Sequence, residues 1–230
     1  MNENIYRIWY KKSGLIRHTS HRDLINTWYI GLSRARLPVQ YTEGFSKKPK
    51  VVFGPALPLG VSSDCEYADL YLKKAPESPA GVLERLGRSF PAGYAFYDCS
   101  RVETPDMLDI AAKFRSFSYD FTFAFGTLQD AAALPAESAM AALLSSNISS
   151  LMASEKFEAD NNGKIRDIRP FVISAGPAVA LPSGNVAVGA DIALIDKSTI
   201  KPQLLLKAML EGIAEGTVYT CRVHKKKINF

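Results

Sequence analysis

Residues 17–60 read RHTSHRDLINTWYIGLSRARLPVQYTEGFSKKPKVVFGPALPLG. Ser20 precedes Asp23 by three residues, a spacing typical of a capping box at the start of a helix. Apolar residues then recur at helical spacing and predict a helix over residues 21–36: Leu24, Ile25, Trp28, Leu32 and Ala35. Pro38 ends this helix because its nitrogen cannot donate a hydrogen bond.

The segments around this helix predict the fold of the first 104 residues. The expected strands are residues 5–10, 51–53, 66–72 and 93–102. Residues 15–16 are expected to be extended as well, and Ser78 with Pro79 marks the start of a second helix. The resulting order, β-α-β-β-α-β, is that of a ferredoxin-like unit with an antiparallel sheet.

A second unit with nearly the same order is expected after a polar linker at residues 103–109. Its expected strands are residues 117–125, 151–158, 164–173, 186–195 and 218–223, and its expected helices are residues 135–145 and 199–210. The sequence DNNG at residues 160–163 is a hairpin signal between two of these strands. We therefore predict an α+β protein of two tandem ferredoxin-like units, residues 1–104 and residues 108–230.

Positive charge is concentrated at the two ends of the chain. The 230 residues carry a net charge of +5, and residues 1–60 hold ten Lys/Arg against three Asp/Glu. A second basic cluster, RVHKKK, lies at residues 222–227. A cationic face of this kind attracts phosphate backbones or acidic protein surfaces, although the same pattern also serves solubility.

The strongest candidate site is the turn at residues 43–50, where lysines stand beside an aromatic residue. Cations that hold phosphates and aromatic faces that stack on bases are what single-stranded RNA binding requires. The candidate nucleic-acid-binding residues are Arg17, Arg22, Arg36, Phe45, Lys47, Lys48, Lys50, Arg222, Lys225 and Lys226. The alternative is that the aromatic residues belong to the core and the lysines only face solvent. Gly44 is expected to adopt a backbone conformation that favours glycine, so that Phe45 and the lysines project from one rigid turn.

Two histidines, His18 and His21, flank Ser20 at the start of the first helix. A neutral imidazole there could act as a general base in metal-independent RNA cleavage, or both could be ordinary turn histidines. No metal site or nucleotide-cofactor motif is expected, because paired ligand spacings, GxxxxGK[ST] and GxGxxG are all missing from the sequence. Three scattered cysteines indicate a reducing cytoplasm, and no apolar run reaches membrane-spanning length.

Several short motifs resemble one bacterial family. They are SHRDL at residues 20–24, ARLP at 35–38, EGFSKKPK at 43–50, LPLGV at 57–61 and EY at 66–67. The family comprises radical-SAM-linked proteins, a domain of unknown function found fused to, or encoded beside, radical SAM proteins with a B12-binding-type domain. Its members typically carry Asn near the position of Ser46 and His near that of Lys48, so the turn departs from the family pattern.

The resemblance implies a radical SAM protein as the partner, and this chain lacks the CxxxCxxC of such an enzyme. We expect an accessory module that binds RNA or presents a substrate, acting in the modification of tRNA or rRNA, with no cofactor and no catalytic role of its own. The alternatives are a ribonuclease that uses His21 and a pure protein-interaction domain that docks on the radical SAM partner.

Overall fold

The computed structural model is a mixed α/β protein whose strand pairings within each unit are antiparallel. It describes residues 4–76, 78–104, 107, 109–125, 137–161, 163–196, 198–213 and 217–230, which contain four α-helices. The chain divides into two compact units, Met1–Lys113 and Phe114–Phe230. In the described residues, no helix is both long and apolar enough to cross a membrane.

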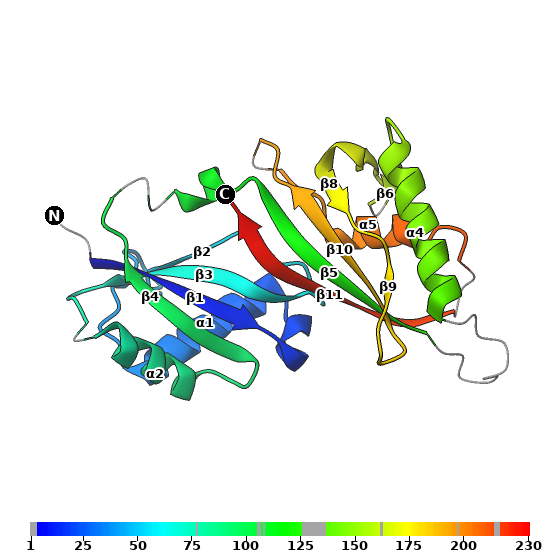
Figure 1. The fold of residues 1–230 in the computed structure, drawn as a ribbon. Helices are drawn as coiled ribbons and strands as arrows, with labels where there is room; N and C mark the ends of the chain where they lie inside the picture. The colour runs from blue at the N-terminus through cyan, green and yellow to red at the C-terminus, as the bar shows by residue number, and fades with distance from the viewer. Residues whose placement is uncertain are drawn as a thin grey trace. The chain divides into compact units, whose positions relative to one another are not determined.

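Unit 1 contains four strands and two α-helices in the order that the sequence predicts. Its elements are β1 (Asn4–Lys12), α1 (His21–Ala35), β2 (Val51–Phe53), β3 (Ser62–Leu72), α2 (Pro79–Ser89) and β4 (Tyr94–Arg101), with short 3-10 turns at Gly14–His18 and Ile110–Lys113. The strands lie side by side in the order β4-β1-β3-β2, and both helices cover one face of this sheet (Figure 1).

The start of α1 confirms Ser20 as the N-cap, with Asp23 as its partner through the hydroxyl. The Ser20 hydroxyl oxygen accepts a hydrogen bond from the Asp23 backbone N–H, at 3.2 Å, and its O–H donates to the Asp23 carboxylate, at 2.7 Å. Just before it, residues 15–16 belong to the 3-10 turn Gly14–His18, so the expected extended conformation was wrong. Gly14 has φ +61°, which reverses the chain after β1 instead of continuing the strand.

Trp28 is the centre of the core between the helices and the sheet. It is fully buried, and its ring lies within 6 Å of the rings of Tyr10, Phe53, Phe90 and Phe96. Tyr6 and Tyr10 of β1 are likewise core residues, so these aromatic side chains are not available for stacking on a base.

The sheet of unit 1 also holds a buried ion pair that the sequence analysis did not anticipate. The Arg7 guanidinium donates two hydrogen bonds to the Asp69 carboxylate, at 2.8 and 2.7 Å, and both side chains are almost fully buried. Arg7 and Asp69 are direct cross-strand partners in β1 and β3. Burial raises the pKa of Asp69, while the hydrogen bonds from Arg7 act in the opposite direction.

The long strands of unit 2 pair antiparallel in the order β11-β5-β10-β8. Its elements are β5 (Ser116–Phe125), α4 (Glu137–Ala153), β6 (Glu158–Asp160), β7 (Ile165–Asp167), β8 (Val172–Ala175), β9 (Val179–Ala180), β10 (Val186–Ala193), α5 (Pro202–Met209) and β11 (Val218–Asn229). β9 pairs with β10, and β6 pairs only with β7 in a separate hairpin.

The middle of unit 2 differs from the prediction. Residues 151–153 end α4 instead of starting a strand, and the expected strand 164–173 is split by a 3-10 turn, Arg169–Phe171. Arg169 explains this arrangement, because its guanidinium donates to the carbonyl oxygens of Met152, Ser154 and Val172. One side chain thus satisfies carbonyls at the end of α4 and ties β8 to that end. The expected start of this helix at residues 135–136 lies outside the described residues.

Candidate nucleic-acid-binding surface

The predicted basic turn is the tip of a hydrogen-bonded hairpin, residues 40–50. The Thr42 N–H donates to the Lys48 carbonyl at 2.8 Å, and the Lys50 N–H donates to the Gln40 carbonyl at 2.7 Å. The Thr42 hydroxyl also accepts from the Lys48 N–H at 3.1 Å. At the base of the hairpin, Tyr71 of β3 exchanges backbone bonds with both arms, donating to Lys50 and accepting from Gln40. The hairpin is therefore fixed to the sheet through its backbone.

Gly44 and Phe45 form the tip of this hairpin. Gly44 has φ +118°, a conformation that favours glycine, which confirms the prediction for this residue. A Cβ atom there would meet no neighbour, so backbone conformation and not space explains the glycine. Phe45 is fully exposed, which excludes the alternative that its ring belongs to the core.

The three lysines of the hairpin do not project together. Lys47 and Lys48 are exposed at the tip, whereas Lys50 is only partly exposed and its ammonium lies 4.0 Å from the centre of the Tyr71 ring. The expectation that all three project from one turn was therefore wrong for Lys50. Lys50 instead lies at the base of the hairpin, where its ammonium forms a cation–π contact with Tyr71 of β3.

Arg17 and His18 lie in the 3-10 turn that precedes α1. The Arg17 Nε–H donates to His18 Nε2 at 3.0 Å, and the backbone carbonyl of Arg17 accepts from the Gly60 N–H at 2.8 Å. Lys12 of β1 stabilises the end of this turn, because its buried ammonium donates a hydrogen bond to the Thr19 carbonyl at 3.1 Å. Burial lowers the pKa of Lys12, and the nearby Glu66 carboxylate acts against that shift.

His21 and Arg22 begin α1 and are both exposed. The His21 ring lies 6.1 Å from the ring of Phe53, edge to face. Among the described residues, no hydrogen bond orients the His21 imidazole, whereas a general base is normally oriented by a partner. The ribonuclease alternative therefore gains no support from this geometry.

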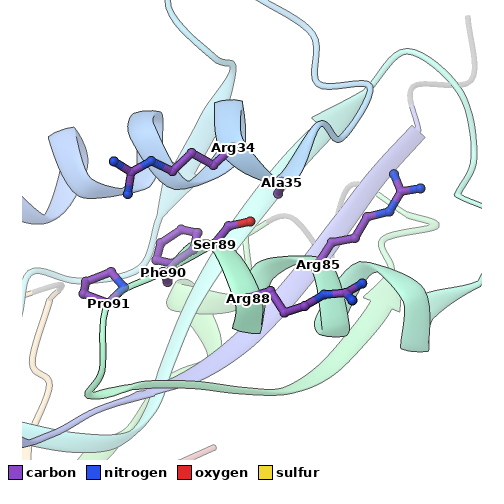
Figure 2. Close-up of a pocket in the computed structure, with 7 residues that line it drawn as sticks. All are labelled: Arg34, Ala35, Arg85, Arg88, Ser89, Phe90 and Pro91. Carbon is purple, nitrogen blue, oxygen red and sulfur yellow. The ribbon is translucent and has the colours of Figure 1, made fainter.

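Arginines at the ends of the two helices of unit 1 were missed by the sequence analysis, with the exception of Arg36. Arg36 caps α1 in the left-handed conformation, with φ +51°. Arg34 of α1 and Arg85 and Arg88 of α2 line a groove of about 490 Å³ (Figure 2). Arg85 and Arg88 are spaced i,i+3, which places them on one helix face. That spacing is visible in the sequence and could have indicated a basic face on α2. The position of Arg34 beside this face depends on how α1 packs against α2, which the sequence does not reveal.

The basic cluster of the last strand is divided between different environments. Arg222 is exposed, and the exposed Lys226 ammonium lies 3.0 Å from the Asp120 carboxylate. Lys225 is buried, 3% exposed, with its ammonium 5.2 Å from the centre of the Phe117 ring. Successive side chains of a strand point to opposite faces, so RVHKKK does not form one exposed cluster and Lys225 is not presented to a ligand.

Metal ligands do not gather within the described parts of the chain, where no group of three His, Cys, Asp or Glu residues could hold an ion. Burial raises the pKa of the Cys99 thiol to about 11 and that of the Cys221 thiol to about 12. Both thiols are therefore protonated near neutral pH, the opposite of what a reactive cysteine requires.

A protein-family model matches residues 5–202, and its description reads uncharacterized protein conserved in bacteria (DUF2344). The match spans most of both units, and the chain belongs to this family. The description names no activity, and it makes no mention of radical SAM proteins. A comparison with curated proteins found no match.

Proposed function

We propose that the chain is an accessory module that binds single-stranded RNA through the hairpin at residues 40–50. The observation that carries this proposal is the fully exposed ring of Phe45 beside the exposed Lys47 and Lys48. A large apolar ring in water is unfavourable for the free protein, and stacking on a base would remove it from solvent. The two ammonium groups would at the same time neutralise neighbouring phosphates.

The proposal includes the finer fold assignment. Both units are ferredoxin-like. In unit 1 the first strand, β1, lies between β4 and β3, and in unit 2 the first strand, β5, lies between β11 and β10. What supports this assignment is the strand order, β4-β1-β3-β2 and β11-β5-β10-β8, together with the helices that connect the strands. Sheets of this type are a common platform for RNA. In this chain the exposed aromatic residue is on a hairpin beside the sheet.

The test is the binding of purified protein to bulk tRNA and rRNA across a salt series. Phosphate-led binding predicts that affinity falls steeply as salt rises, with about 0.7 units of logarithmic slope for each phosphate contact to a single strand. The double variant Lys47→Ala/Lys48→Ala should flatten the slope by about 1.4 units. Lys164→Ala/Lys201→Ala, which removes two exposed lysines of unit 2, is the matched control and should leave it unchanged. If wild type binds no RNA at low salt, the proposal fails.

A radical SAM enzyme is the proposed partner, and the support for it is the resemblance of the motifs at residues 20–61. Co-purification of such an enzyme with the tagged chain, before and after ribonuclease treatment, tests this part. Loss of the enzyme after treatment would indicate that RNA joins the two, and retention would indicate direct docking. Its absence from both samples would contradict the partnership.

A further inference from the structure

The groove between the ends of α1 and α2 is lined by basic and apolar side chains. Arg34, Arg85 and Arg88 line it, together with Ala35, Ser89, Phe90 and Pro91. All three arginines are exposed. The Arg88 guanidinium forms an ion pair with the Glu84 carboxylate at 3.2 Å, and both of these side chains are mostly exposed. Since an exposed pair of this kind is weak, Arg88 remains able to bind an anion.

A second groove of about 250 Å³ is a neighbour of the first, and Arg85 lines both. Its other cations are Arg36 and Lys74, and its lining includes Leu37, Pro38 and Val82. No acidic residue is found among the described residues that line either groove. The cations of the two grooves lie at the end of α1, just before α2 and along α2, and they are named here the basic strip: Arg34, Arg36, Lys74, Arg85 and Arg88.

Two contacts of Lys73 connect this strip to the hairpin at residues 40–50. The Lys73 N–H donates to the carbonyl of Pro38, a residue of the second groove, at 2.7 Å. The Lys73 ammonium lies 5.9 Å from the centre of the Tyr41 ring, and Tyr41 pairs with Pro49 in the hairpin. From the hairpin, cations therefore follow one another through Lys73 and Lys74 to the arginines of the two helices.

We propose that the basic strip binds successive phosphates of the same RNA strand whose base stacks on Phe45. This inference rests on the proposed function and extends the binding site from a single hairpin to a path across unit 1. In Figure 2 the guanidinium groups of Arg34 and of Arg85 and Arg88 do not converge on one point. Separated guanidinium groups suit a chain of phosphates better than a single anion, and each can hold a phosphate with two parallel N–H···O bonds.

The test compares two lengths of single-stranded RNA, about 4 and about 16 nucleotides, which bracket common site sizes for such strands. The variant Arg34→Gln/Arg85→Gln/Arg88→Gln removes the charges but keeps side chains that suit a helix. For the longer RNA it should flatten the salt slope by about 2 units. The ratio of wild-type to variant affinity should therefore be about 100-fold larger at 0.1 M salt than at 1 M salt. For the shorter RNA, held by the hairpin, binding should stay close to wild type.

The control variant Lys113→Gln/Lys164→Gln/Lys201→Gln removes three exposed charges outside the strip. Its salt slope for the longer RNA should stay closer to that of wild type than the slope of the arginine variant does. A thermal melt of each variant checks folding, and single Arg→Gln variants replace the triple one if it melts early.

If the arginine variant binds both RNAs like wild type while Phe45→Ala loses affinity, the strip is not part of the RNA path although the hairpin is. If the arginine variant loses an acidic protein partner and no RNA affinity, the strip is a protein-docking surface and the inference is wrong. If wild type binds neither RNA, the proposed function itself fails.

Discussion

Phe45→Ala separates binding from folding, because the ring has no packing to lose. Phe45 is fully exposed at the tip of a hairpin whose hydrogen bonds are made by its neighbours' backbones. Truncation of a buried phenylalanine costs about 3–5 kcal/mol of stability. At this position, by contrast, the free energy of unfolding should change by no more than about 0.5 kcal/mol, as for other surface substitutions.

The loss of RNA affinity should be much larger than the loss of stability. Stacking of one base on one aromatic ring contributes about 1–3 kcal/mol, so the Kd for single-stranded RNA should rise by roughly 5- to 150-fold. Fluorescence anisotropy with a labelled oligonucleotide gives the Kd, and a thermal melt of the same sample gives the stability. Phe45→Trp should bind at least as well as wild type, because the indole offers a larger face for stacking.

Leu15→Ala is the matched control, since Leu15 is 88% exposed and lies in the 3-10 turn outside the hairpin. It should leave both the Kd and the melting temperature unchanged. An unchanged Kd for Phe45→Ala, in a protein that does bind RNA, would refute the stacking argument. An equal loss of affinity in Leu15→Ala would show that general surface hydrophobicity, and not a defined stacking contact, holds the RNA.

Three further predictions concern the fold of unit 1. Asp69→Ala should lower the free energy of unfolding by about 3–5 kcal/mol in a urea titration, because it leaves the buried Arg7 guanidinium unpaired, and a loss below 1 kcal/mol would contradict this. Gly31→Ala should destabilise the protein by about 1–3 kcal/mol despite the higher helix propensity of alanine, since its Cβ would collide with the Phe90 ring; an unchanged urea midpoint would mean that the ring moves freely. Stability should fall as pH rises above about 8.5, since the pKa of Cys99 is about 11 in the folded protein and about 8.5 in an unfolded chain; Cys99→Ala should reduce this loss between pH 8 and pH 10, and an identical loss would assign it to other groups.

The parts of the fold that the sequence predicted are those specified by adjacent residues. The N-cap Ser20 fixes the start of α1, and Ser78 with Pro79 fixes the start of α2. Strand β5 was readable because its apolar residues alternate along the chain, as its burial does. The errors lie where a distant group decides. The guanidinium of Arg169 settles the end of α4, and no local pattern contains that information.

The candidate binding surface divides in the same way. The tip of the hairpin is one continuous stretch of sequence, EGFSKKPK at residues 43–50. Its glycine, aromatic residue and lysines could therefore be recognised together. Lys225 was included because a run of basic residues was taken as one surface, although the alternation of β11 buries that residue. Arg85 and Arg88 were omitted because nothing near them in the sequence indicates that the end of α1 lies opposite.

The hairpin that carries Phe45 is rigid for a physical reason, and this bears on how it could bind. Its two arms pair with each other and with Tyr71 of β3, and Gly44 supplies the one backbone conformation at the tip that other residues rarely adopt. The conformational entropy of the loop is therefore lost when unit 1 folds and not when a ligand arrives. A flexible loop of the same composition would lose that entropy on binding. The free-energy cost of this loss would offset the gain from its weak contacts to one base and two phosphates. On the proposed function, the combination of a fixed backbone and a fully exposed ring would allow so small a contact to contribute measurable affinity.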